Sequence, residues 1–105
     1  MRYSDTIELI SESWENSAEG VSQPLRGSRR VFCRVRSISS SEFFRAGQEG
    51  LRARWQFTVW PDEYRGETLV RYGGQVYGIY RTYRAGRDAL ELYAELKAGT
   101  SEREG

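Results

Sequence analysis

The sequence has 105 residues, the size of one domain, and is polar, with 38% hydrophobic residues and a mean hydropathy of −0.72. No run approaches the ~20 apolar residues of a membrane span, and the polar start does not resemble a signal peptide. Histidine is absent, which excludes Ser-His and Cys-His triads, and no glycine-rich phosphate loop is found. We therefore expect a single domain from residue 1 to residue 105, with no enzyme activity, no catalytic residues, no cofactor and no metal.

Charge is segregated along the chain although the net charge is only +1. Residues 1–20 carry Arg2 against five carboxylates, a net charge of −4, whereas residues 21–60 carry eight arginines against Glu42 and Glu49, a net charge of +6. Nearly all the basic residues are arginine, whose planar guanidinium suits contacts with carboxylates and phosphates. A GC-rich genome would also favour arginine. The functional interpretation is complementary patches on neighbouring subunits, or a basic rim facing DNA.

The first half of the chain predicts two strands separated by a loop. Residues 3–14 indicate a strand, and residues 15–27, polar and with two glycines and a proline, predict a flexible loop. Residues 29–37 alternate as a strand does. Its inward residues are Val31, Cys33 and Val35, and its outward residues are Arg30, Phe32, Arg34 and Arg36. Cys33, the only cysteine, is interpreted as a buried, inert thiol, which predicts folding in a reducing cytoplasm.

The periodicity changes at Ser39. The residues from Ser39 to Glu42 fit a capping box, in which the serine hydroxyl and the carboxylate each bind the other's backbone N–H. Two phenylalanines follow, and Gly47 and Gly50 end the predicted helix after about two turns. Because so short a helix is marginal alone, tertiary or quaternary contacts must hold it.

The second half predicts four further strands. Residues 53–60 alternate with Trp55, Phe57 and Val59 inward and Arg54, Gln56, Thr58 and Trp60 outward. After a turn at 61–66, residues 67–72 lead into a Gly73-Gly74 hairpin turn. From Gln75 the predicted strand places Val76, Gly78, Tyr80 and Thr82 on one side and Tyr77, Ile79, Arg81 and Tyr83 on the other. Residues 84–87 form a second predicted turn, and residues 98–105 a disordered tail.

Residues 88–96 are ambiguous. Their Ala, Leu and Glu content favours a helix, whereas the apolar residue at every second position from Leu90 to Leu96 favours a strand. As a strand, this segment completes an all-β domain: a small six-stranded antiparallel barrel or sandwich with one short helix between strands 2 and 3. The predicted core contains Val31, Val35, Trp55, Phe57, Ile79 and Leu92.

The order of these elements resembles a known family. An aromatic residue, a glycine turn, VYGIYRTY and then DALELYAELKAG are similar to the C-terminal signature of the head–tail joining proteins of tailed bacteriophages, also called head-closure or stopper proteins. Upstream, VFCRVRSISSSEFFRAGQEGLRARWQFTVWPDEYRGETLVRY resembles the middle of the same family. The resemblance spans residues 30–99, about three quarters of the chain, and it implies a strand at 88–96.

The resemblance implies a structural role in the virion. Such proteins assemble in the host cytoplasm as a ring, dodecameric to match the portal, beneath the portal and its adaptor. The ring seals the channel over the packaged double-stranded DNA and offers the tail an attachment surface, without contact with a membrane. The isolated protein is then expected to be monomeric or weakly associated.

Two sets of residues are candidate sites for this role. The insertion, residues 39–52, supplies the channel or gate candidates, although it is equally consistent with a helix that plugs one end of the barrel with its phenylalanines in the core. We expect it to be mobile in the free protein and fixed on assembly. The channel candidates are Phe43, Phe44, Arg45, Gln48, Glu49 and Arg52, and the subunit-interface candidates are Arg30, Phe32, Arg34, Arg36, Glu8, Glu12, Glu91 and Glu95.

Three plainer interpretations remain open. The arginine ladder is also typical of a solvated strand face, and Arg45 is also placed to pair with Glu42 or Glu49 on the helix. A small barrel with outward arginines and many tyrosines is also typical of a nucleic-acid-binding module, the main alternative function. An unrelated tail-assembly or scaffold barrel is a further alternative.

Overall fold

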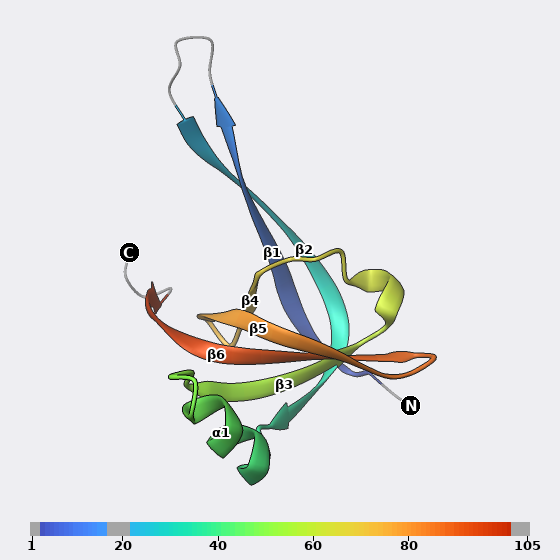
Figure 1. Ribbon diagram of the computed structural model, residues 1–105. Helices are drawn as coiled ribbons and strands as arrows, with labels where there is room; N and C mark the ends of the chain where they lie inside the picture. The colour runs from blue at the N-terminus through green and yellow to red at the C-terminus, as the bar shows by residue number, and fades with distance from the viewer. Residues whose placement is uncertain (1–2, 17–21, 102–105) are drawn as a thin grey trace.

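The computed structural model describes residues 3–16 and 22–101, which form a closed β-barrel with one helix (Figure 1). The elements in chain order are β1 (Asp5–Asn16), β2 (Ser22–Ser37), α1 (Ser40–Gly47), β3 (Ala53–Val59), the short 3-10 turn η1 (Pro61–Glu63), β4 (Leu69–Tyr72), β5 (Gln75–Gly86) and β6 (Ala89–Ser101). The barrel order is β1-β2-β3-β6-β5-β4, and every neighbouring pair is antiparallel. The predicted six-stranded antiparallel fold, with a short helix between strands 2 and 3, is confirmed as a barrel.

The core follows the alternation of the strands. Phe57 and Leu92 are fully buried and face each other across β3 and β6, and Cys33 is buried as predicted. Burial, and to a lesser degree the nearby Asp5 charge, raises the pKa of the Cys33 thiol to about 12, which makes it unreactive. The remaining core residues share the barrel interior: Ile7, Leu9, Val31, Val59, Val70, Tyr77 and Ala94, with Val35, Trp55 and Ile79 packed against them and partly buried.

Thr58 departs from the predicted pattern. It was expected to face water, but its side chain is fully buried. Its neighbours in register are Arg34 on β2 and Glu91 on β6. A short side chain between two long ones is shielded even on the outer face of a sheet.

Glycine sets the tightest turn of the barrel. Gly73 and Gly74 have φ values of +61° and +79°, and Tyr72 pairs with Gln75 across them. Two consecutive residues with positive φ match the twist of a two-residue hairpin, and glycine adopts that conformation without steric cost. The predicted hairpin is confirmed. The following turn lies slightly later than predicted, since Gly86 still belongs to β5 and pairs with Ala89.

The ambiguous segment is a strand, and it continues beyond its predicted end. Leu92 and Ala94 point into the core while Glu91 and Glu95 stay half-buried on the other side. β6 extends to Ser101, which pairs with Gln75, so the prediction of a disordered tail is wrong for residues 98–101. Backbone pairing with β5 orders this stretch although its composition is polar. Residues 102–105 lie outside the described part of the chain.

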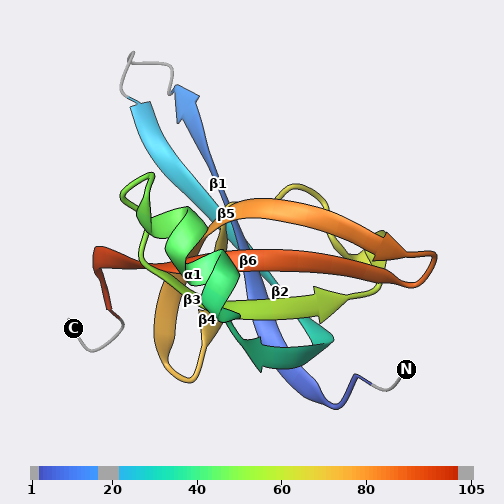
Figure 2. The same ribbon diagram turned by 60° about the horizontal axis from the view of Figure 1, so that its bottom comes forward.

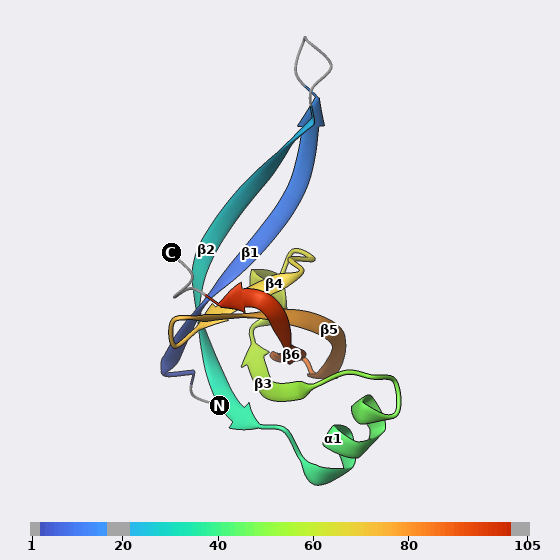
Figure 3. The same cartoon turned by 90° about the vertical axis from the view of Figure 1, so that its left-hand side faces the viewer.

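The first two strands are also longer than predicted. β1 runs to Asn16, β2 begins at Ser22, and these two residues pair, so the predicted loop is wrong at both its ends, while residues 17–21 lie outside the described residues. Pro24 and Gly27, which indicated a loop, are tolerated because a two-stranded ribbon leaves one edge of each strand open. We call residues 11–16 and 22–27 the arm. The arm projects away from the barrel in Figures 1 and 3, in a molecule measuring 48 × 30 × 24 Å.

Candidate assembly surfaces

The insertion begins with a helix whose start is fixed by one serine. The backbone N–H of Glu42 donates to Oγ of Ser39, the N-cap residue, at 3.2 Å. This half of the predicted capping box is confirmed. The other half is wrong, because the Glu42 carboxylate binds side chains of the barrel and of α1 in place of the Ser39 backbone. At the far end, Gly50 has a φ of +80° and turns the chain back towards β3.

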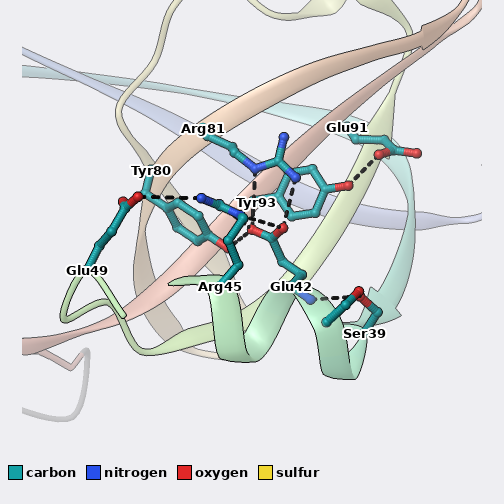
Figure 4. Close-up of polar contacts among 9 residues, drawn as sticks. Ser39, Glu42, Arg45, Glu49, Tyr80, Arg81, Glu91 and Tyr93 are labelled. Carbon is teal, nitrogen blue, oxygen red and sulfur yellow. Dashed lines mark hydrogen bonds and ion pairs between the residues drawn. The ribbon is translucent and has the colours of Figure 1, made fainter. Parts of the chain in front are cut away.

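Glu42 attaches the helix to the outer wall of the barrel (Figure 4). Its carboxylate, only 8% exposed, accepts hydrogen bonds from Arg81 Nη2 at 2.9 Å, from the Tyr80 hydroxyl at 2.5 Å and from Arg45 Nη2 at 2.9 Å. The hydrogen bonds from Arg81, together with those from Arg45 and Tyr80, outweigh burial and lower the pKa of Glu42 to about 2. Burial and the bond to Glu42 raise the pKa of the Tyr80 hydroxyl in turn. The helix is therefore held by an ionised, nearly buried carboxylate.

A β-bulge brings two consecutive residues to this carboxylate. Ile79 pairs with Ala94, but Arg81 pairs with Tyr93, so β5 contains one extra residue between these pairs. Both Tyr80 and Arg81 consequently reach Glu42 on the outer face. The predicted strict alternation, which placed Arg81 on the side of Ile79, is wrong at this point. The alternating sequence contains no signal for the bulge, so sequence reasoning missed both contacts.

Tyr93 lies beneath the same cluster. The Arg81 guanidinium lies 4.1 Å from the centre of the Tyr93 ring, and the Tyr93 hydroxyl donates to Glu91 Oε1 at 2.6 Å. Burial, followed by that hydrogen bond, raises the pKa of Tyr93 to about 12. We call Glu42, Arg45, Tyr80, Arg81 and Tyr93 the Glu42 anchor.

The anchor contradicts the interpretation of the helix as a barrel plug. Glu42 and Ala46 are its buried residues, and α1 lies against β3 outside the barrel (Figure 2). Phe43 and Phe44 are 52% and 68% exposed and contact each other edge to face, with ring centres 5.7 Å apart. The phenylalanines are thus displayed to solvent by a helix that is fixed from its other side.

The other predicted channel residues differ in whether they form ion pairs. Arg45 Nη1 lies 3.6 Å from Glu49 Oε2, in addition to its bond with Glu42, so the plainer ion-pairing use of Arg45 is confirmed. Gln48 and Arg52 are exposed. A hollow of about 220 Å³ separates the insertion from the barrel wall, and it is lined by Phe43, Leu51, Arg52, Ala53, Arg54 and Leu96.

The basic half of the predicted subunit interface lies together on β2. Arg30, Phe32 and Arg36 are exposed, and 63% of the Phe32 surface is accessible to solvent. In the described part of the chain, Arg30, Arg34 and Arg36 form no ion pair. The Nε atom of Arg34 is buried and has no hydrogen-bond acceptor. This arginine–aromatic face therefore has capacity for acceptors from outside the subunit.

The acidic half of that prediction is largely engaged within the subunit. Glu8 pairs with Arg71 between β1 and β4, Glu91 accepts the Tyr93 hydroxyl, and Glu12 also interacts within the chain. Glu95 is half-buried on β6. Whether these residues also contact a neighbouring subunit stays a prediction.

An aromatic groove adjoins the basic face. It encloses about 470 Å³ and is lined by Tyr3, Arg30, Val31, Phe32, Trp60 and Glu63. The Tyr3 and Trp60 rings meet edge to face with centres 5.6 Å apart, and the Tyr3 hydroxyl donates to the Asp88 carbonyl at 2.7 Å. Sequence reasoning placed Trp60 outward but did not associate it with Tyr3, because the two residues lie far apart along the chain.

A second buried carboxylate fixes the loop that follows η1. Glu67 accepts hydrogen bonds from Arg29 Nη2 at 2.7 Å and from the Arg65 backbone N–H at 2.8 Å. Burial opposes ionisation, but these bonds hold the pKa of Glu67 below its usual range. This contact positions the chain beside β2 and was not predicted from the sequence.

Comparisons with known proteins add no family assignment. No protein-family model matches this sequence, and a search of curated proteins found no match. Within the described residues, no helix has the length and apolarity needed to cross a membrane, and no three His, Cys, Asp or Glu side chains gather as a metal site would require.

Proposed function

We propose that this protein is a structural joining protein in the neck of a tailed bacteriophage. Copies of the chain form a ring, twelve to match the portal, beneath the portal and its adaptor. The ring closes the channel over the packaged double-stranded DNA and presents a surface to which the tail attaches. The protein acts by binding, and it resides in the virion after assembly in the host cytoplasm.

The observation that carries this proposal is the display of Phe43 and Phe44 on an anchored helix. To form a ring, each subunit needs a rigid body with exposed apolar surfaces that neighbouring chains cover. The barrel supplies the rigid body, and the exposed aromatic pair supplies such a surface at the insertion between strands 2 and 3. We assign the channel-facing role to this insertion because it departs from the barrel and presents the two phenylalanines beside arginine and glutamine side chains.

The location of the protein is tested directly in purified particles. Antibodies against the protein are expected to label the junction between head and tail in electron micrographs of phage particles that carry this gene. Absence of the protein from purified particles, in mass spectra as well as in micrographs, would contradict the proposal.

The role of the insertion is tested with a matched pair of variants. Phe43→Ser/Phe44→Ser removes exposed aromatic surface on the outside of α1 and leaves the Glu42 anchor intact, so the melting temperature is expected to stay close to that of the wild type. Tyr83→Ser removes a comparably exposed ring, 56% accessible, on β5. The first variant is expected to yield heads that lose DNA or fail to join tails, whereas the second assembles normally. Full titres from both variants would assign no role to the aromatic pair.

A nucleic-acid-binding module is the second candidate, and the arginine–aromatic face of β2 favours it. Phe32 and Trp60 offer stacking surfaces beside Arg30, Arg34 and Arg36. This function predicts that the isolated protein binds short single-stranded DNA tightly and that raising the salt concentration weakens binding steeply. Weak binding at both low and physiological salt would leave the joining function as the better one.

A further inference from the structure

The arm leaves strand edges open on both of its sides. From Ser11 to Asn16, β1 pairs among the described residues with β2 alone, because β4 reaches only Glu8 to Ile10. On the other side, β2 pairs with β3 only from Arg34 to Ser37. An isolated two-stranded ribbon is marginally stable in water, and unpaired edges accept further strands. The arm is therefore a place where another chain can add by backbone hydrogen bonds.

The two strands of the arm carry opposite charge. In the arm, β1 contains Glu12 and Glu15 and no basic residue, and β2 contains Arg26 and no acidic residue. Beyond the arm, β2 continues with Arg29 and Arg30 before its pairing with β3 begins at Arg34. Side by side, two β1 strands would oppose like charges, which destabilises a strand pair, whereas β1 beside β2 opposes unlike charges. The charge distribution thus favours an unequal contact between the two edges.

The same contact is geometrically consistent with a ring. β1 and β2 run antiparallel within one arm. If successive copies are related by rotation about an axis along the arm, β2 of one copy lies antiparallel to β1 of the next. Each copy then uses one edge towards each neighbour, a heterologous contact that closes when the rotation permits. Pro24 removes one backbone donor from β2, so the uninterrupted donors are on β1 from Ser11 to Asn16.

We propose that the β1 edge of one arm pairs with the β2 edge of the arm of a second copy of this chain, head to tail. The occupant of the open edge is thus the chain itself, and the arms of successive copies form one continuous antiparallel sheet. This inference rests on the proposed function only in that copies assemble with one another. It needs neither the portal nor DNA.

Chemical cross-linking between two different cysteine variants tests the pairing. One variant carries Ser13→Cys on β1 and another Gln23→Cys on β2, and the wild type controls for Cys33, which is buried. Each protein alone and the equimolar mixture are treated with a short bis-maleimide over a series of concentrations. The mixture is expected to give a cross-linked heterodimer well above the dimer formed by either variant alone.

A charge variant supplies a second, independent readout. Glu15→Arg, introduced into the Ser13→Cys protein, is expected to lower the heterodimer yield, and added salt is expected to lower the yield of the Ser13→Cys and Gln23→Cys mixture without this change. In the register of its own arm, Glu15 lies opposite Gln23, which carries no charge. Asp62→Arg is the matched control, since Asp62 is exposed in η1, away from the arm strands, and it leaves the yield unchanged.

Each other result overturns the proposal. Cross-linking of Ser13→Cys with itself as efficiently as with Gln23→Cys indicates symmetric β1 pairing. No heterodimer up to the highest soluble concentration excludes arm pairing in this protein. Because no phage particle is involved, neck labelling without cross-linking refutes this inference alone, and cross-linking without neck labelling refutes the proposed function alone.

Discussion

The arm and the insertion both project from the barrel, at opposite ends of the molecule in Figures 1 and 3, but different forces hold them. The insertion is fixed by side chains: one carboxylate, Glu42, accepts hydrogen bonds from Arg81, Tyr80 and Arg45. The arm is held by backbone pairing between β1 and β2. The insertion therefore depends on single residues and on their ionisation, whereas the arm depends on pairing that no single side chain provides.

The consequence for assembly follows from this difference. The Glu42 anchor holds the helix against the barrel and gives Phe43 and Phe44 a defined position, which argues against the expectation that the insertion is mobile in the free protein. A ribbon with open edges has backbone groups that bind water until another strand pairs with them. The two ends are suited to two kinds of contact, one by side chains and one by main chain.

The largest expected effect concerns the barrel that carries both regions. Phe57 is fully buried, whereas Trp55 is only partly buried. Phe57→Ala is expected to lower the free energy of unfolding by about 3–5 kcal/mol, through lost burial and the cavity it leaves. Trp55→Ala is expected to cost less. Urea denaturation of both variants measures the difference, and the reverse order would show that the core is centred elsewhere.

Removing the anchor carboxylate has the next largest effect. Glu42→Ala leaves Arg81 and Tyr80 without their acceptor and is expected to cost about 1–3 kcal/mol of stability. This range takes account of Arg45 and Arg81, which are 44% and 36% exposed and thus partly screened by solvent. Amide exchange should rise in α1 and stay unchanged in the arm. Glu49→Ala is the control, with an expected cost of about 0–1 kcal/mol because Glu49 is exposed.

Lowering the pH is expected to weaken the attachment of the insertion, which depends on an ionised carboxylate, but not the backbone pairing of the arm. The pKa of Glu42 is lowered to about 2 from a usual value of 4.5, so its ionisation stabilises the fold above pH 4.5, and this contribution is lost as the pH falls towards 2. The stability difference between the wild type and Glu42→Gln is therefore expected to be greatest above pH 4.5 and to shrink as the pH is lowered. Denaturation curves at a series of pH values measure this difference. A gap that does not change with pH would show that Glu42 is not held ionised by the anchor.

Shortening the arm is expected to have the smallest effect on stability. Glu12 and Arg26 are cross-strand partners, so an Asn-Gly turn can replace residues 13–25 and join them directly. Because the arm lies beyond the barrel, we expect the free energy of unfolding of the shortened protein to differ from that of the wild type by less than about 1 kcal/mol. Self-association is expected to be lost. A large loss of stability would show that the arm contributes to the core.

Sequence reasoning identified what depends on local pattern. The alternation of residues 29–37 and 90–96 assigned the core faces correctly, and the glycine pair at 73–74 predicted its turn, because strand period and backbone sterics act over a few residues. The Ser39 cap was also readable, since its hydrogen bond spans only three residues.

Only the tertiary structure decided where the helix is attached and how far the strands continue. Glu42 finds Arg81 39 positions away because a bulge in β5 turns Tyr80 and Arg81 to the same side, and no local pattern contains that bulge. The polar composition, glycines and proline of residues 15–27 predict a loop, and residues 98–101 are predicted as part of a tail, yet residues 15–16, 22–27 and 98–101 belong to strands. Backbone pairing with a neighbouring strand overrides such composition, since the hydrogen bonds come from groups that nearly every residue carries.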